Sequence, residues 1–207
     1  MTKIEITEAI ALKVRETVDA GLVRGVGKPV PGQMCVEAAV CYALGLEHGD
    51  DPMCVSPALR RLKISLNDRS WSSNHARAKG LRRLALAQLG SRDVLDDKEF
   101  VRRVVEMTIR KSVPAALRSA AKVNPKHAEK LEAAAVKCET EGTRESAREA
   151  EKIADAASYA DAADADADAA DAAAYAAAAR QKAYKRQADK LIELLAAAPI
   201  PAQAVAA

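Results

Sequence analysis

Residues 143–198 read TRESAREAEKIADAASYADAADADADAADAAAYAAAARQKAYKRQADKLIELLAAA. Alanine is the background of this segment, aspartate recurs through its centre, and neither glycine nor proline interrupts it. Alanine has the highest intrinsic helix propensity, whereas glycine and proline are the strongest helix breakers. The segment therefore predicts a single long helical arm, and it favours an all-α fold for the chain.

Two stripes run along the predicted arm at helical spacing. Alternate steps of three and four residues from Ile153 give a heptad seam made mostly of alanine, which is typical of a coiled coil. A second stripe, offset by one residue, is acidic. The residues expected to contact a partner are Ala160, Ala163, Ala167, Ala170, Tyr184, Leu191 and Leu195 on the seam and Asp161, Asp164, Asp168 and Asp171 on the acidic stripe.

Two interpretations of the arm stay open. Like charges at these spacings destabilise an isolated helix by about 0.2–0.5 kcal/mol per pair, so a basic partner surface would turn the acidic stripe into a contact. In the first interpretation, two arms pair with each other or one arm docks on another protein. In the second, the arm packs on the body of its own chain and the acidic stripe faces solvent.

Composition and charge change after Gly142. Residues 1–142 hold 24 Lys and Arg against 18 Asp and Glu, whereas residues 143–207 hold 8 against 11. The chain is thus a basic body joined to an acidic arm, although its formal net charge is only +3. We expect a basic helical body over 1–142, the long amphipathic, coiled-coil-like arm over 143–198 and a disordered tail over 199–207.

Within the body, capping residues and helix breakers predict about seven helices and no strand. Residues 33–44 are apolar on nearly every side, which predicts a central buried helix that ends at Gly45. Pro114 is expected to interrupt the helix that contains Phe100 and Val104. The signals for helix starts are Ser56 before Pro57, residues 72–74, Asp96 or Asp97, and Asn124 before Pro125.

The N-terminal stretch MTKIEITEAIALKVRETVDAG alternates charges with an apolar stripe, unlike a secretory signal peptide. No stretch approaches the run of about 20 strongly apolar residues that spans a membrane. We therefore expect a cytoplasmic protein with no membrane segment, and we expect no cofactor. In that compartment the cysteines, which are Cys35, Cys41, Cys54 and Cys138, are expected to be reduced thiols.

Two groups of side chains in the body could carry chemistry. Cys35 begins a predicted helix two residues after Gln33, which resembles the Gln-x-Cys edge of papain-like cysteine enzymes, and the helix dipole would lower the thiol pKa. The alternative is that Cys35 is a small buried apolar residue. Cys35, Cys41, His48 and Cys54 could form a zinc site, although neighbouring zinc ligands are usually closer in sequence, or they could be core thiols and an exposed histidine.

Basic residues gather in two successive predicted helices on either side of Trp71, and they could bind nucleic acid or an acidic protein surface. They are Arg60, Arg61, Lys63, Arg69, Arg77, Lys79, Arg82 and Arg83. The loop between the two helices is longer than the turn of a helix-turn-helix motif. The alternatives are an ordinary solvated surface and a patch that the acidic arm covers.

The body and tail resemble hypothetical proteins of high-GC bacteria and phages in the stretches CVEAAVCYALGLEHGDDPMCVSPALRRLKISLND and WSSNHARAKGLRRLALAQLGS and in the Ala-rich tail. That resemblance implies a bacterial or phage origin and assigns no role to any residue. From the residues themselves we expect a non-enzymatic interaction or assembly protein whose arm mediates oligomerisation or partner docking. The alternatives are a nucleic-acid-binding protein that uses residues 60–83 and a small cysteine-dependent enzyme that uses Cys35.

Overall fold

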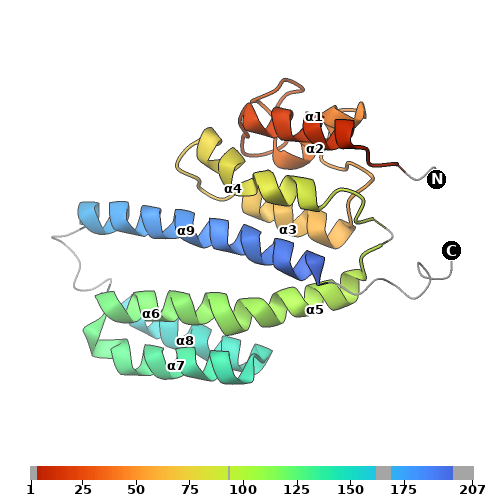
Figure 1. Cartoon of the computed structure of the whole chain (residues 1–207). Helices are drawn as coiled ribbons and strands as arrows, with labels where there is room; N and C mark the ends of the chain where they lie inside the picture. The colour runs from red at the N-terminus through yellow and green to blue at the C-terminus, as the bar shows by residue number, and fades with distance from the viewer. Residues whose placement is uncertain (1–3, 93, 162–168, 198–207) are drawn as a thin grey trace. The chain divides into compact units, whose positions relative to one another are not determined.

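The computed structural model describes residues 4–92, 94–161 and 169–197, and these residues are mostly helical (Figure 1). They form nine α-helices, one π-helical segment and one 3-10 turn, with no β-strand beyond a single bridge between Gly27 and Met34. The all-α prediction is confirmed. The chain divides into a first unit, Met1–Val101 with Ala177–Ala207, and a second unit, Arg102–Ala176. Gly142, where the composition changes, lies inside the second unit.

The first unit is built around one buried helix. It contains α1 (Glu8–Asp19), α2 (Val36–Leu44), α3 (Pro57–Asn67), α4 (Asn74–Ala87) and the later part of α9 (Ala169–Ala196). Helix α2 packs against α1, α3 and α4, and seven of its nine residues are buried. The predicted central helix is therefore confirmed, although it begins at Val36 and not at residue 33. It ends at Gly45, whose left-handed φ of 69° is a conformation that glycine adopts without strain.

Helix starts in the first half of the chain follow the predicted caps. The side chains of Ser56, Ser73 and Asp96 each accept a hydrogen bond from the backbone N–H three residues ahead, at 3.2, 3.0 and 3.0 Å. At Asn124 the prediction is correct in position, since helical structure begins at Pro125, but wrong in the cap itself, because the Asn124 side chain makes no capping hydrogen bond and its Nδ2 donates to the carbonyl of Ala157 at 3.2 Å. A 3-10 turn, Pro125–His127, intervenes before the next helix.

The later part of α9 packs within the first unit through named contacts. The rings of Trp71 and Tyr184 lie 5.4 Å apart between centroids, and Arg83 pairs with Asp189 at 3.0 Å. The Trp71 ring also lies directly over Gly80 of α4, where an added Cβ would stand 2.4 Å from the ring. Glycine in the middle of α4 is thus explained by the tryptophan that packs on it.

The second unit begins at Arg102, inside α5 (Asp97–Met107). It continues through a π-helical segment (Thr108–Ser112) to α6 (Val113–Val123), α7 (Ala128–Glu141) and α8 (Arg144–Asp161). The predicted interruption at Pro114 is wrong, because the helical path runs through it. The preceding Val113 N–H donates to the Thr108 carbonyl five residues earlier. This wider π spacing shifts the hydrogen-bond pattern just where Pro114 brings no donor.

The core of the second unit is made mainly of small side chains. It comprises Ile109, Leu117, Leu131, Ala134, Ala135, Cys138, Ala150 and Ala157. Arg110 closes the end of α7, because its guanidinium donates to the carbonyls of residues 139, 140 and 141 at 2.7 to 2.9 Å. Gly142 then turns the chain into α8 with a φ of 65°, and a Cβ there would stand 2.4 Å from Arg110 Nε.

The predicted arm corresponds to two described helices, α8 and α9. Residues 162–168 lie outside the described residues, so an uninterrupted helix over 143–198 stays a prediction. The same holds for the tail over 199–207. Ala150 and Ala157 of α8 belong to the core of the second unit, and the later residues of α9 belong to the first unit.

The contact between Trp71 and Gly80 makes a stability prediction. Gly80→Ala is expected to destabilise the protein by about 1–3 kcal/mol, because the added methyl group overpacks the Trp71 ring even though alanine favours helix. Urea unfolding followed by the fluorescence of this single tryptophan measures the effect. Lys79→Ala, at an exposed position of the same helix, is the matched control and should change stability by less than about 0.5 kcal/mol. A stabilised Gly80→Ala protein would contradict the packing described above.

Candidate functional site

Three polar side chains are enclosed at the centre of the first unit. Lys63 of α3 pairs with Glu37 of α2 at 3.1 Å between Nζ and Oε1, and both side chains are 0% exposed. Gln88, which follows α4, donates from Nε2 to the other carboxylate oxygen of Glu37 at 3.2 Å. The polar groups of three successive helical segments therefore meet inside an apolar core.

This buried cluster is incompletely hydrogen-bonded. Within the described part of the chain, Lys63 Nζ approaches Glu37 without the alignment of a hydrogen bond, and Gln88 Oε1 has no partner. Burial raises the pKa of the Glu37 carboxyl and lowers the pKa of the Lys63 ammonium, and each charge opposes the shift of the other. Because both side chains are sealed from solvent, the cluster fixes how α2, α3 and α4 pack and offers no surface for a ligand.

Cys35 is a buried helix cap. Its Sγ accepts a hydrogen bond from the Ala38 N–H at 3.3 Å at the start of α2, and the side chain is 4% exposed. Burial raises the pKa of its thiol although two backbone N–H groups oppose the shift, so the expected lowering by the helix dipole is wrong. Gln33 is exposed, whereas Cys35 is buried. The adjoining cavity of about 70 Å³ is far smaller than the pockets of about 300–1,000 Å³ that bind small ligands.

The proposed zinc ligands are not assembled. Among the described residues no three His, Cys, Asp or Glu side chains form a group that could hold a metal ion. Cys35, Cys41 and Cys54 are buried thiols, and burial raises the pKa of Cys41 to about 12. His48 is exposed and its Nε2 lies 3.1 Å from the carbonyl of Gly27. This arrangement matches the alternative of core thiols and an exposed histidine.

The predicted basic surface is divided by burial and pairing. Lys63 is sealed in the core, and Arg77 is buried, donating from Nε to the carbonyl of Asn67 at 2.8 Å and from Nη1 to that of Leu22 at 2.9 Å. Three more cations are in ion pairs, which are Arg60 with Asp50, Arg82 with Asp19 at 3.2 Å and Arg83 with Asp189 at 3.0 Å. Arg61, Arg69 and Lys79 are exposed. Such a surface offers few of the unpaired cations that phosphate binding needs.

The predicted contact residues of the arm fall into two groups. Tyr184, Leu191 and Leu195 are described, and they are buried or half-buried in the first unit, so they pack within their own chain. Ala163, Asp164, Ala167 and Asp168 lie outside the described residues, and the side chains of Ala160, Asp161, Ala170 and Asp171 lie outside the described part as well. The acidic stripe therefore stays a prediction.

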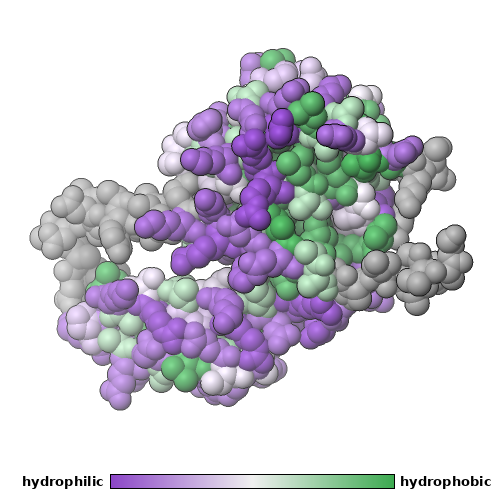
Figure 2. Space-filling view, viewed as in Figure 1, coloured by the Kyte–Doolittle hydropathy of each residue, from purple (hydrophilic) through white to green (hydrophobic). Residues whose placement is uncertain are grey.

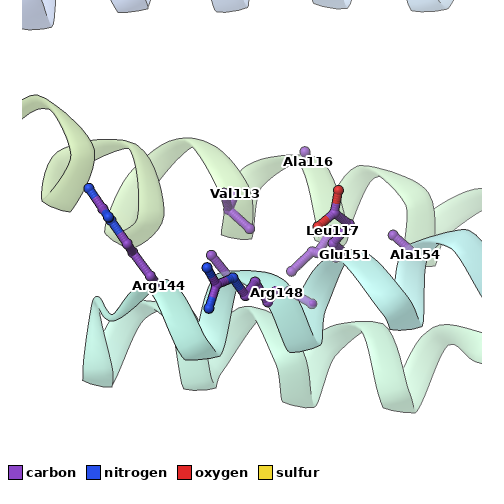
Figure 3. Close-up of a pocket in the computed structure, with 9 residues that line it drawn as sticks. Val113, Ala116, Leu117, Arg144, Arg148, Glu151 and Ala154 are labelled. Carbon is purple, nitrogen blue, oxygen red and sulfur yellow. The ribbon is translucent and has the colours of Figure 1, made fainter.

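An open groove lies between α6 and α8 in the second unit (Figure 3). It has a volume of about 460 Å³ and its lining is mainly apolar. The lining residues are Val113, Ala116 and Leu117 from α6 and Arg144, Ala147, Arg148, Ala150, Glu151 and Ala154 from α8. Helix α7 packs closely on both α6 and α8, whereas α6 and α8 contact each other much less, which leaves the groove between them.

Short side chains form the floor of this groove, and long side chains stand at its edge. The floor consists of alanine side chains on α8 and of the exposed Ala116 on α6. In Figure 3 the side chains of Arg144 and Glu151 extend from α8 toward α6. The result is a shallow apolar floor with charged residues of both signs at its edge. A helix with small side chains could lie in such a groove, because small residues allow two helix backbones to approach closely.

The face of α6 and α7 that Figure 2 shows is mostly hydrophilic. On the same two helices Arg118 pairs with Glu132 at 2.8 Å and with Glu139 at 2.6 Å. With its mainly apolar lining, the groove is the strongest candidate site in the described part of the second unit.

The sequence predicted neither the buried pair of Glu37 and Lys63 nor the groove between α6 and α8. Glu37 stands in a helix that is otherwise apolar, and Lys63 stands on the same face as Leu59 and Leu66, which is the signal of a buried pair. For the groove, Ala147, Ala150 and Ala154 recur at helical spacing, on positions that the seam proposed for the arm does not include. Nothing in the sequence shows that this row is partly open rather than fully packed.

No family model matches the chain, and neither a comparison with curated proteins nor one with solved structures gave a match. The resemblance that implies a bacterial or phage origin thus stays a prediction. No helix among the described residues combines the length and the apolarity needed to cross a membrane.

Substitutions in the buried pair of Glu37 and Lys63 are predicted to change the stability of the protein. Lys63→Met is expected to destabilise the protein by about 3–5 kcal/mol, because it leaves the Glu37 carboxyl without its counter-charge. The double variant Glu37→Gln with Lys63→Met should recover most of that loss. In the single variant, the Glu37 pKa is higher folded than unfolded, so the loss is smallest at low pH and grows as the pH rises through the folded pKa.

Urea unfolding of the wild type and of both variants at about pH 5 and about pH 8 measures these differences. Arg61→Met, at an exposed position of the same helix, serves as the control. If Lys63→Met behaved like Arg61→Met at both pH values, the pair would not organise the core.

Proposed function

We propose that the protein is a non-enzymatic assembly protein that associates with a second copy of itself through the groove between α6 and α8. The observation that carries this proposal is the groove itself. It has a volume of about 460 Å³, an apolar floor, and charged residues of both signs at its edge. Mixed charges at the edge of an apolar floor suit a protein surface, which has an apolar centre and a polar rim.

The alternatives receive less support. A cysteine-dependent enzyme needs an accessible thiolate, and burial raises the pKa of all four cysteines. A nucleic-acid-binding surface needs clustered free cations, and those between residues 60 and 83 are largely buried or paired.

The proposed role of the arm is narrower than the sequence suggested. Tyr184 and Leu191 pack within their own chain, so the later arm is engaged before any partner arrives. Helix α8, the first part of the arm, has a buried side with Ser146, Ala150 and Ala157 and an open side at the groove. We therefore place the assembly surface on α8 and α6.

The first experiment is the absolute mass of the full-length protein by size-exclusion chromatography with light scattering over a concentration series. A multiple of 22.0 kDa that grows with concentration is the expected result. Ala116→Glu, which puts a charge on the exposed lining of the groove, should shift the protein toward the monomer. Ala115→Glu, exposed on the same helix but not part of the lining, is the matched control and should leave the mass unchanged.

A mass of 22.0 kDa at every concentration would contradict the assembly proposal. If Ala116→Glu and Ala115→Glu changed the mass equally, the proposal would also be wrong, because the association would then use another surface.

A further inference from the structure

Four charged residues form one row along the open side of α8. They are Arg144, Arg148, Glu151 and Asp155, all of them exposed. Their spacing of four, three and four residues places them on one face of the helix. The first three line the groove, and the fourth follows one turn beyond Glu151. Within the described residues none of the four lies in an ion pair, in contrast to Glu149 on the other side, which pairs with Lys137.

The order of these charges is unfavourable for a helix by itself. Arg144 stands in the first turn, where the helix dipole favours acidic residues. Arg144 and Arg148 are also like charges four residues apart, as are Glu151 and Asp155, and each such pair destabilises a helix by about 0.2–0.5 kcal/mol. Arg148 and Glu151 are opposite charges three residues apart, and their attraction offsets part of this cost. The row therefore gains little from its own helix, and its exposed charges are available to pair with another surface.

The charged row of α8 is complementary to the same row on a second, antiparallel copy. If a second α8 runs antiparallel to the first, about a two-fold axis at the level between residues 149 and 150, Arg144 comes opposite Asp155 and Arg148 comes opposite Glu151. The two-fold axis repeats both pairs, which gives four contacts of opposite charge. Parallel helices would instead place Arg against Arg and acid against acid. An isologous dimer uses one surface on both copies, and this row satisfies that condition only in the antiparallel direction.

The groove provides the apolar part of the same contact. Ala147 and Ala154 are half-buried beside the row, and Ala116 is exposed across from them on α6. Alanine side chains let two helices approach to the short end of the usual interaxial range, about 8 Å. At that distance the long side chains of Arg144, Arg148 and Glu151 can reach the partner helix.

We infer that the groove binds α8 of a second copy in antiparallel orientation, with Arg144 and Arg148 of each copy paired to Asp155 and Glu151 of the other. This inference rests on the proposed self-association and adds its partner helix, its direction and the residues that set specificity. Ion pairs at a rim contribute more to the choice of partner than to affinity. The row thus determines which way the copies pair, and the apolar floor supplies most of the binding.

Charge reversal tests the inference. The acidic variant carries Arg144→Glu and Arg148→Glu, and the basic variant carries Glu151→Arg and Asp155→Arg. Each variant by itself should self-associate at least about tenfold more weakly than the wild type, because four like charges then face four like charges. An equimolar mixture should form a heterodimer with about wild-type affinity, and the variant with all four substitutions should again form a homodimer.

Analytical ultracentrifugation gives the association constants, with one variant fluorescently labelled in the mixture. Circular dichroism confirms folding, which exposed substitutions are expected to leave intact. Orientation has its own measurement, since oxidising a mixture of Arg148→Cys and Glu151→Cys proteins should form the mixed disulfide faster than either protein by itself forms its own.

The outcomes separate the two proposals. If the wild type associates, Ala116→Glu weakens it and charge reversal has no effect, the antiparallel pairing is overturned and the assembly role stands. If identical cysteines cross-link faster than the mixed pair, the antiparallel direction is overturned. If the wild type is monomeric at every concentration, both proposals fall.

Discussion

The ion pair between Lys63 and Glu37 is the constraint on which the first unit depends. A buried charge without a counter-charge is strongly destabilising, so α2 and α3 are restricted to positions in which these two side chains meet. The amide of Gln88 adds the end of α4 to the same requirement. An apolar core of alanine, valine and leucine tolerates many packings of similar volume, whereas this cluster tolerates few. We therefore expect the pair to select one arrangement among several that hydrophobic burial would allow.

The consequences of that arrangement extend to the loop before α2. Asn67, at the end of α3, accepts from the Val36 N–H at 3.3 Å and donates to the Val23 carbonyl at 3.0 Å. Arg77 of α4 binds the carbonyl of Leu22 at the beginning of the same loop. Residues 22–36 are therefore attached to the ends of two helices whose positions the buried pair determines. Cys35 takes its place in this framework as a cap, which explains why its thiol is structural.

Local signals in the sequence were sufficient for much of this fold. The side chain of Ser56 and the backbone of Gly45 act within one turn of the chain, and such effects can be predicted without knowing what lies nearby. Asn124 could not be predicted in this way, because its amide binds the carbonyl of Ala157, 33 residues away. The burial of Lys63 and Arg77 has the same cause, since each lies on an apolar face of its helix and meets its partner only after folding. The groove was least predictable, because alanine serves equally well in a core and on a surface.

The composition of the second unit gives its groove a thermodynamic meaning. Apolar burial contributes in proportion to area, and alanine side chains at positions such as 134, 135, 150 and 157 bury little of it. Small units bury a low fraction of their surface and are marginally stable. Contacts such as the Arg110 guanidinium on the end of α7 offset part of this deficit, but the apolar floor between α6 and α8 stays exposed. A partner that binds only the folded unit stabilises it by mass action. Occupation of the groove would therefore be coupled to the stability of the helices that form it, so that assembly and folding of this unit reinforce each other.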